Sequence, residues 1–299
     1  PLSVGLFAGK WCSYSATPDL PHDQREEDGG ALTFTSDPLE APLEILGAPV
    51  AELDLAADRP VAMIAVRLSD VQPDDNATRV TYGVLNLTHR DGHARPSPLE
   101  PGRRYRVRVQ LNDIAQAFPR GHRLRISIST SYFPLAWPPP EPVRLTIFAG
   151  ASELVLPERP QREESVSFAE AEGAASGARR TLSDTHHNWR VIRDLAQDRS
   201  TLEVINDNGL FELQDINLKL RNSAEEWYSY QGDDFSSARG ETLWRRGSQR
   251  GDWNVETVTH TTLCCDPSRF KLSAELDAYE NKKLVHSRYW DIEIDRDLV

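Results

Sequence analysis

Cysteine and methionine are scarce in this 299-residue chain, which holds three cysteines and one methionine. Cys12 stands alone and Cys264 and Cys265 are adjacent, so the set is too small and too irregular for a disulfide framework or a zinc cage. Neighbouring residues on a strand point to opposite faces, which predicts two ordinary thiols in the pair. With no leader ahead of the first strands, the low cysteine count predicts a reducing, cytoplasmic setting.

Long apolar runs and an excess of positive charge are missing too. No run approaches the length that crosses a bilayer, and 34 Lys and Arg against 46 Asp and Glu give a formal charge of -12. Such a charge repels phosphate backbones at long range. We therefore expect neither a membrane nor nucleic acid as a partner. The length and the 39% hydrophobic fraction fit a globular chain with room for two domains.

The sequence also lacks the motifs that carry common enzyme chemistry. No serine has the G-x-S-x-G surroundings of an α/β-hydrolase nucleophile, since residues 150–154 read GASEL and residues 247–251 read GSQRG. Residues 5–10, GLFAGK, are one spacer short of a phosphate-binding loop. His186 and His187 are neighbours that would point apart on a strand, so they do not suggest a metal site. We assign no catalytic residue, no metal ligand and no cofactor to this chain.

The sequence predicts strands, most clearly between Pro101 and Pro142. Two runs in this stretch alternate apolar residues with arginine, serine and glutamine, and side chains on a strand alternate between faces. Each run is therefore predicted to have one apolar face and one solvent-exposed face, and Arg104, Arg106 and Arg108 are predicted to face solvent. The apolar members of the two runs are Tyr105, Val107, Val109, Leu111, Leu124, Ile126 and Ile128.

Similar short runs, bounded by turn residues and without helical periodicity, fill most of the chain. This pattern predicts an all-β protein, a jelly-roll sandwich followed by a second β-rich domain or extension. Residues 158–180 are poor in large apolar side chains and read as a linker. The predicted organisation is a connecting segment (1–30), a jelly roll (31–157), the linker (158–180) and a second β-rich domain (181–299). Hairpin turns are expected at residues 206–209 and 280–282.

The tryptophans allow two interpretations. Trp244, Trp253 and Trp290 lie in predicted strands, where aromatic residues usually belong to the core but can also form a stacking platform for a sugar. Trp137 differs because prolines flank it in SYFPLAWPPP, which predicts a rigid loop whose indole packs on something, such as another domain.

Five short motifs, in this order, resemble the C-terminal part of a group of serine hydrolases. The group comprises cocaine esterase, α-amino acid ester hydrolase and X-Pro dipeptidyl-peptidase. One departure is Asp75, where the family usually has glycine after Pro-Asp, and it is expected to alter a turn. The resemblance covers residues 20–157. The motifs are Asp23-Gln24-Arg25 before an acidic pair, Arg67 to Asp74 with Asp70 at its centre, Pro101-Gly102, Gly121-His122-Arg123-Leu124-Arg125 and Ser131-Tyr132-Phe133-Pro134.

The resemblance implies a parent enzyme that cleaves an ester or amide by acyl transfer to serine, with histidine as base. In that family the catalytic triad precedes the motifs found here, so this chain is expected to be inactive alone and to have an α/β-hydrolase domain as its partner. A jelly roll against that domain would shape the substrate cleft and exclude water from it. The residues proposed for the cleft or the domain interface are Leu6, Phe7, Trp11, Phe133 and Trp137.

Two other functions stay open at this stage. A free-standing β module that binds carbohydrate or protein would use the exposed tryptophans and carry no chemistry. An isolated paralogue that has lost its catalytic half would serve in assembly. The residues name no substrate and leave the oligomeric state, including a homo-oligomer, undecided.

Overall fold

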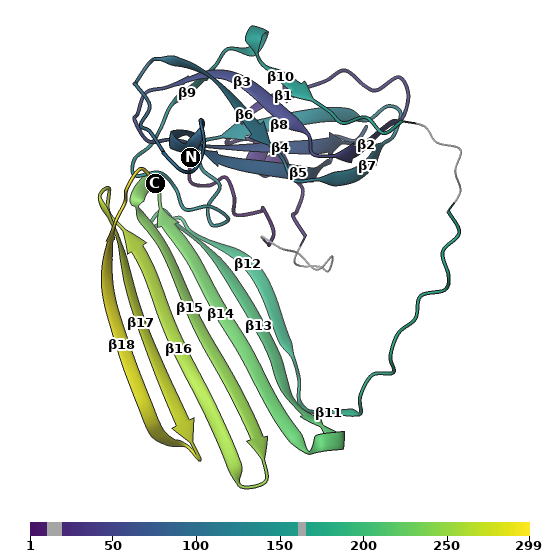
Figure 1. The fold of residues 1–299 in the computed structure, drawn as a ribbon. Helices are drawn as coiled ribbons and strands as arrows, with labels where there is room; N and C mark the ends of the chain where they lie inside the picture. Colours follow the sequence, from purple (N-terminus) through teal and green to yellow (C-terminus); the bar gives the residue numbers. More distant parts are fainter. Residues whose placement is uncertain (11–19, 161–165) are drawn as a thin grey trace. The chain divides into compact units, whose positions relative to one another are not determined.

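The computed structural model describes residues 1–10, 20–160 and 166–299. These residues form two compact units: one holds residues 1–160 with 232–238 and 296–299, and the other holds residues 161–231 with 239–295. The model is all-β, as predicted (Figure 1). No helix in the described part of the chain is long and apolar enough to cross a membrane.

The first unit is a β-sandwich made of short antiparallel strands. One sheet has the order β1-β8-β4-β5, a second has the order β10-β3-β6 with β9 also on β3, and β2 pairs with β7. A short helix, α1, precedes them. The bounds are α1 Arg25–Asp28, β1 Leu32–Thr35, β2 Leu43–Gly47, β3 Val50–Ala57, β4 Met63–Val71, β5 Ala77–Asn86, η1 Leu87–His89, β6 Arg104–Gln110, β7 Ile114–Phe118, β8 Arg123–Ser129, β9 Leu145–Ile147, η2 Ala149–Ala151 and β10 Glu153–Val155.

The core lies between the two larger sheets. Leu53 and Leu55 of β3 and Val107 of β6 meet Ile64 and Val66 of β4, and all five are buried. The other face of β4 is also covered, because Met63 and Ala65 pack with residues of the N-terminal segment and the corner after β8. β4 is therefore buried along its whole length. This double cover explains why its first four residues, Met63 to Val66, are all apolar rather than alternating, and why the polar residues further along the strand are buried as well.

The prediction for the stretch 101–142 is right for one strand and wrong for the other. In β6 the alternation matches burial, and the arginines reach solvent and pair with carboxylates, Arg104 with Asp54 and Arg106 with Glu52 and Glu153. In β8 the predicted wet face is covered, since Ser127 and Ser129 are buried. The reason is that the second face of β8 is covered by the segment around α1, where Arg125 and Ser127 donate to Asp28.

The second unit is one eight-stranded antiparallel sheet of long strands (Figure 1). Its order is β11-β13-β14-β15-β16-β17-β18, with β12 beside the first part of β13. The bounds are β11 Arg179–Ser183, β12 His186–Asp194, β13 Arg199–Leu213, η3 Gln214–Ile216, β14 Leu218–Gln231, β15 Asp234–Arg250, β16 Trp253–Cys265, β17 Arg269–Glu280 and β18 Lys283–Asp295.

Two hairpin turns were predicted in this unit, and one is wrong. Asn281 and Lys282 have positive φ and join β17 to β18, as expected. Residues 206–209 lie inside β13 instead, where the register shifts between Asp207 and Leu210 in a β-bulge. Gly209 has a φ of +66°, and a Cβ there would lie 2.4 Å from the Ser183 carbonyl oxygen. The turn-like residues thus serve the bulge and the close approach of β11.

Apolar residues of the last two strands share one face of the sheet. Leu272 pairs with Ile292 and Ala274 pairs with Trp290. The adjacent cysteines of β16 face opposite ways: Cys264 pairs with Lys271, and Cys265 pairs with Phe270. Cys12 lies outside the described residues.

Candidate functional site

The first resemblance motif, Asp23-Gln24-Arg25, leads into α1, which places Glu27 and Asp28 inside the sandwich unit. Asp23 accepts hydrogen bonds from the backbone N–H groups of Arg25 (3.1 Å) and Ala77 (3.3 Å) and from the Arg25 side chain. The Gln24 amide donates to the carbonyl of His22 at 2.8 Å. These local bonds hold the four-residue helix, which is too short to be stable by itself.

Glu27 is the centre of the site. Its side chain is fully buried, and one carboxylate oxygen accepts hydrogen bonds from the backbone N–H groups of Gly5 (2.8 Å) and Phe7 (2.9 Å). The other oxygen accepts from the Arg67 guanidinium at 2.8 Å. A single carboxylate thus ties the N-terminal segment to β4.

Arg67 is the buried cation that these carboxylates surround. Its guanidinium is fully buried and donates to Gln24 at 2.9 Å, to Glu27 at 2.8 Å and to Asp28 at 3.3 Å. Asp28 in turn accepts from Arg125 (2.9 Å) and Ser127 (2.7 Å) of β8. A buried arginine needs such partners, because an unpaired charge in this position would cost several kcal/mol.

An aromatic pair lies beside this buried cation. Tyr132 is fully buried, its ring centroid lies 6.0 Å from the Arg67 guanidinium carbon, and its hydroxyl accepts from Arg79 at 2.5 Å. Tyr82 lies 5.5 Å from Tyr132, between centroids. Burial raises the pKa of Tyr132 to about 12, so this phenol is a neutral hydrogen-bonding group rather than a base near neutral pH.

A second polar cluster at the end of β4 contains the motif residues Asp70, His122 and Arg123 together with Asp75. His122 lies 2.8 Å from Asp70, measured from its Nδ1 to the carboxylate oxygen, and Arg123 pairs with Asp75. Asp75 has a φ of +69° and lies in the loop between β4 and β5. Glycine adopts this left-handed conformation most readily, and the ion pair with Arg123 gives aspartate a partner there.

The residues predicted for a cleft or interface are brought together, but not all keep a free surface. A Cβ on Gly5 would lie 2.3 Å from the carbonyl oxygen of Phe133, so the N-terminal segment passes directly against the corner after β8. Leu6 and Phe133 are fully buried there. Phe7 and Trp137 are half-buried, and Trp137 packs edge-on against Phe133 with 5.6 Å between ring centroids. Trp11 lies outside the described residues.

Asp28, Arg79 and Ser127 join these motifs in the structure and were not predicted from the sequence. One signal was available: Arg67 is a charged residue that follows six apolar residues, Val61 to Val66. A charge in such a run needs a buried partner, and only acidic side chains can supply it.

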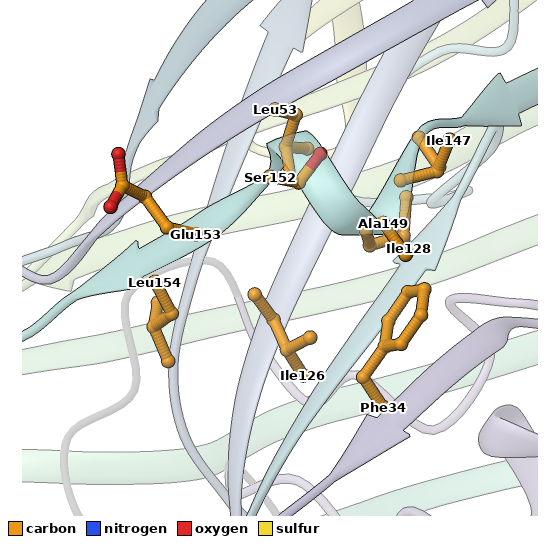
Figure 2. Close-up of a pocket in the computed structure, with 9 residues that line it drawn as sticks. All are labelled: Phe34, Leu53, Ile126, Ile128, Ile147, Ala149, Ser152, Glu153 and Leu154. Atoms are coloured by element: carbon orange, nitrogen blue, oxygen red, sulfur yellow. The ribbon is translucent and has the colours of Figure 1, made fainter.

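The sandwich also has an apolar hollow between its two larger sheets, of about 200 Å³ (Figure 2). Phe34 of β1 and Ile126 of β8 line one side, and Leu154 of β10 lies near them. The Ser152 hydroxyl is already engaged, since it donates to Phe148 and accepts from the Asp54 N–H. Figure 2 shows the Glu153 carboxylate turned away from the hollow. The hollow therefore offers space for an apolar group and no chemistry.

Neither cluster has the arrangement of a catalytic site. The titratable groups of the Glu27 and Arg67 network are buried and paired within the chain. Within residues 1–10, 20–160 and 166–299, no group of three His, Cys, Asp or Glu side chains could hold a metal ion. The geometry is that of a β-sandwich with an internally fastened N-terminal segment.

The chain belongs to the family described as the X-Pro dipeptidyl-peptidase C-terminal non-catalytic domain, whose model matches residues 1–192. This confirms the family resemblance. Cocaine esterase of Rhodococcus sp. (strain MB1 Bresler) is 28% identical over 116 residues, which are 38% of this chain and 20% of that protein. The match therefore spans about one fifth of the length of this relative.

Two solved structures are similar to the chain. An aminopeptidase from a marine sediment archaeon, Thaumarchaeota archaeon, matches with a TM-score of 0.45 and 23% identity, over 50% of this chain and 30% of that chain. An α-amino acid ester hydrolase matches with a TM-score of 0.45 and 26% identity, over 48% of this chain and 28% of that chain.

Glu27 and Asp23 are expected to give pH dependences of opposite sign. Burial raises the pKa of Glu27 above 4.5, although Arg67 and two N–H groups offset part of the effect. Folding thus favours the protonated form of Glu27. The contribution of Glu27 to the free energy of unfolding is therefore complete at low pH and is lost as pH rises through the raised pKa. Burial also acts on Asp23, but hydrogen bonds from Arg25 and Ala77 prevail and hold its pKa below 3.8. Its contribution is present at neutral pH and is lost in acid.

The measurement is the free energy of unfolding as a function of pH for the chain and for Glu27→Gln and Asp23→Asn. The advantage of the unmodified chain over Glu27→Gln should shrink as pH rises, and its advantage over Asp23→Asn should shrink as pH falls. Slopes of the same sign for the two variants would contradict the prediction.

Proposed function

We propose that this chain is the accessory C-terminal part of a serine acyl hydrolase and that it packs against an α/β-hydrolase domain, where it shapes the substrate cleft. The observation that carries the proposal is the family match over residues 1–192 to a non-catalytic domain of a peptidase. The matched region is one fifth of the esterase relative. This relative supports an ester or amide as the bond that the whole protein would cleave.

The N-terminal segment supports the same proposal, because its surface is held rigidly. Glu27 fastens the backbone of Gly5 and Phe7, and Gly5 passes against Phe133. Phe7 and Trp137 are half-buried, so each keeps part of its apolar ring surface for a neighbour. Rigid aromatic groups are typical anchors of an interface, because little conformational entropy is lost when they are covered.

The test uses the longer polypeptide in which a hydrolase domain precedes this region. In that protein Phe7→Ala and Trp137→Ala should each lower kcat/KM for an ester substrate by about threefold to tenfold, the value of one lost aromatic contact. The control is Phe148→Ala, which removes a half-buried aromatic ring at the end of β9 where Arg104 covers it. Equal effects of the three substitutions would show that the region around Phe7 and Trp137 has no special part in the cleft.

A further inference from the structure

One face of the second unit has a hollow of about 420 Å³ between β15 and β16. Strand β15 supplies Thr242, Trp244 and Arg246, and β16 supplies the residues paired with them, Thr261, Thr259 and Thr257. Directly paired residues of antiparallel strands share a face. A tryptophan and an arginine therefore lie beside a row of three threonine hydroxyl groups.

The register extends this face across β17 and β18. Thr261, Thr259 and Thr257 pair with Ala274, Leu276 and Ala278, which pair in turn with Trp290, Arg288 and His286. Because strands lie about 4.8 Å apart, the side chains of β15 and β18 stand on the same face about 14 Å apart. We call the hollow and the residues beside it on this face the threonine trough: Trp244 and Arg246 border the threonine row on β15, and Trp290 and Arg288 lie beyond the β17 residues on β18.

Each side of the trough pairs an indole ring with a guanidinium group. The Arg246 guanidinium carbon lies 5.1 Å from the centroid of the Trp244 ring, and that of Arg288 lies 4.7 Å from the Trp290 ring. The indoles are half-buried, and the two arginines are exposed. Both cations are therefore available to a ligand lying in the trough.

Charge is divided between the two faces of these four strands. A row here means the residues paired with one another across β15 to β18. In the rows from Thr242 to Arg246, the trough face carries Arg246 and Arg288 and no carboxylate. The first carboxylate on this face is Glu280, one row further along, where it pairs with Val255. On the opposite face, Glu275 and Asp277 lie between these rows, and Glu241 and Asp291 lie one row before them. In a chain with a formal charge of -12, the trough face is therefore locally cationic.

We propose that the threonine trough binds an acidic oligosaccharide, a short glycan that carries carboxylate groups. Indole rings stack on the apolar faces of sugar rings, and guanidinium groups pair with carboxylates in two-point hydrogen bonds. Threonine hydroxyls both donate and accept, as the hydroxyl groups of a sugar require. A nucleic acid fits less well, because its affinity rests on many phosphate contacts and the trough offers two arginines on an acidic chain.

This site is distinct from the proposed interface, since it lies on the sheet of the second unit and uses none of the residues of the sandwich. The test is a calorimetric titration of the full chain with a galacturonic acid tetrasaccharide. A galactose tetrasaccharide tests the need for carboxylates, and an eight-residue single-stranded DNA tests the other class of anion.

Two neighbouring arginines of β15 provide a matched pair of variants. Arg246 faces the trough, while Arg245 pairs with Val258 on the opposite face. Arg246→Ala should weaken binding of the uronic acid tetrasaccharide about tenfold, the loss expected for one charge-assisted contact, and Arg245→Ala should leave it unchanged. Because Arg246 is exposed, its replacement should not disturb folding.

Saturable binding of the acidic tetrasaccharide, absent for the galactose form and weakened by Arg246→Ala alone, supports the proposal. It is overturned by the absence of binding at millimolar ligand, by equal effects of the two arginine variants, or by tighter binding of the DNA. None of these outcomes bears on the role of Phe7 and Trp137.

Discussion

Replacing Arg67 by methionine is expected to destabilise the sandwich unit by about 3–5 kcal/mol, the usual effect of removing one partner from a buried ion pair. The substitution leaves the carboxylate of Glu27 fully buried without its cation and removes one of the partners of Asp28. Methionine fills a similar volume, so the loss reports the charge more than a cavity. Hydrogen exchange of the β4 amides, followed by mass spectrometry of peptides, measures the effect on this unit alone.

The control for this prediction is Arg106→Met. Arg106 also bridges two carboxylates, Glu52 and Glu153, but its side chain is half exposed. Its replacement should change the stability by no more than about 1 kcal/mol, because water screens an exposed pair. If both variants had the same effect on β4, the buried network would have no special weight in the fold.

Gly5→Ala is expected to be the most damaging small substitution in the N-terminal segment. Gly5 has a φ of +122°, and a Cβ there would lie 2.3 Å from the Phe133 carbonyl oxygen and 2.7 Å from the Phe133 backbone nitrogen. Backbone cannot give way as a flexible side chain can, so the segment must shift and loosen its bonds to Glu27. We expect a loss of about 3 kcal/mol or more, from backbone strain and overpacking together.

Gly92→Ala separates these two causes. Gly92 has a similar φ of +133°, but nothing lies within 4 Å of the position where a Cβ would be added. It should show only the strain, about 1–3 kcal/mol. The measurement is the midpoint of urea unfolding together with hydrogen exchange of residues 1–8. An effect of Gly5→Ala no larger than that of Gly92→Ala, with unchanged exchange in the segment, would contradict the close contact seen here.

The local alternation of apolar and polar residues was enough to predict the strands. It did not predict which faces are exposed where both faces of a strand are covered. In β6 one face meets the core and the other meets water, so its alternation matches its burial. β8 has the same kind of alternation, yet Ser127 and Ser129 are buried. Serine and arginine on that face contact Asp28 and neighbouring polar atoms. A polar residue in a strand therefore indicates either solvent or a buried partner, and spacing alone does not distinguish them.

The candidate site was only partly predictable for a related reason. The motifs around Asp23, Arg67 and Tyr132 were found by their resemblance, but nothing local shows that they meet. Glu27 and Arg67 are forty residues apart in sequence and 2.8 Å apart in the structure. Leu6 and Phe133 were expected at a cleft, and the structure buries both. The predicted domain boundaries and the proposed contacts with a hydrolase domain stay predictions.

By itself the sequence determined the all-β class, the absence of familiar catalytic motifs and the family, because each depends on residue types and short spacings that folding does not change. Only the tertiary structure decided which charges are buried, which strands are covered on both faces and which tryptophans stand beside arginine. The physical reason is that burial and pairing are properties of contacts between distant segments. The free energy of a charge such as Arg67 depends on what those segments bring to it.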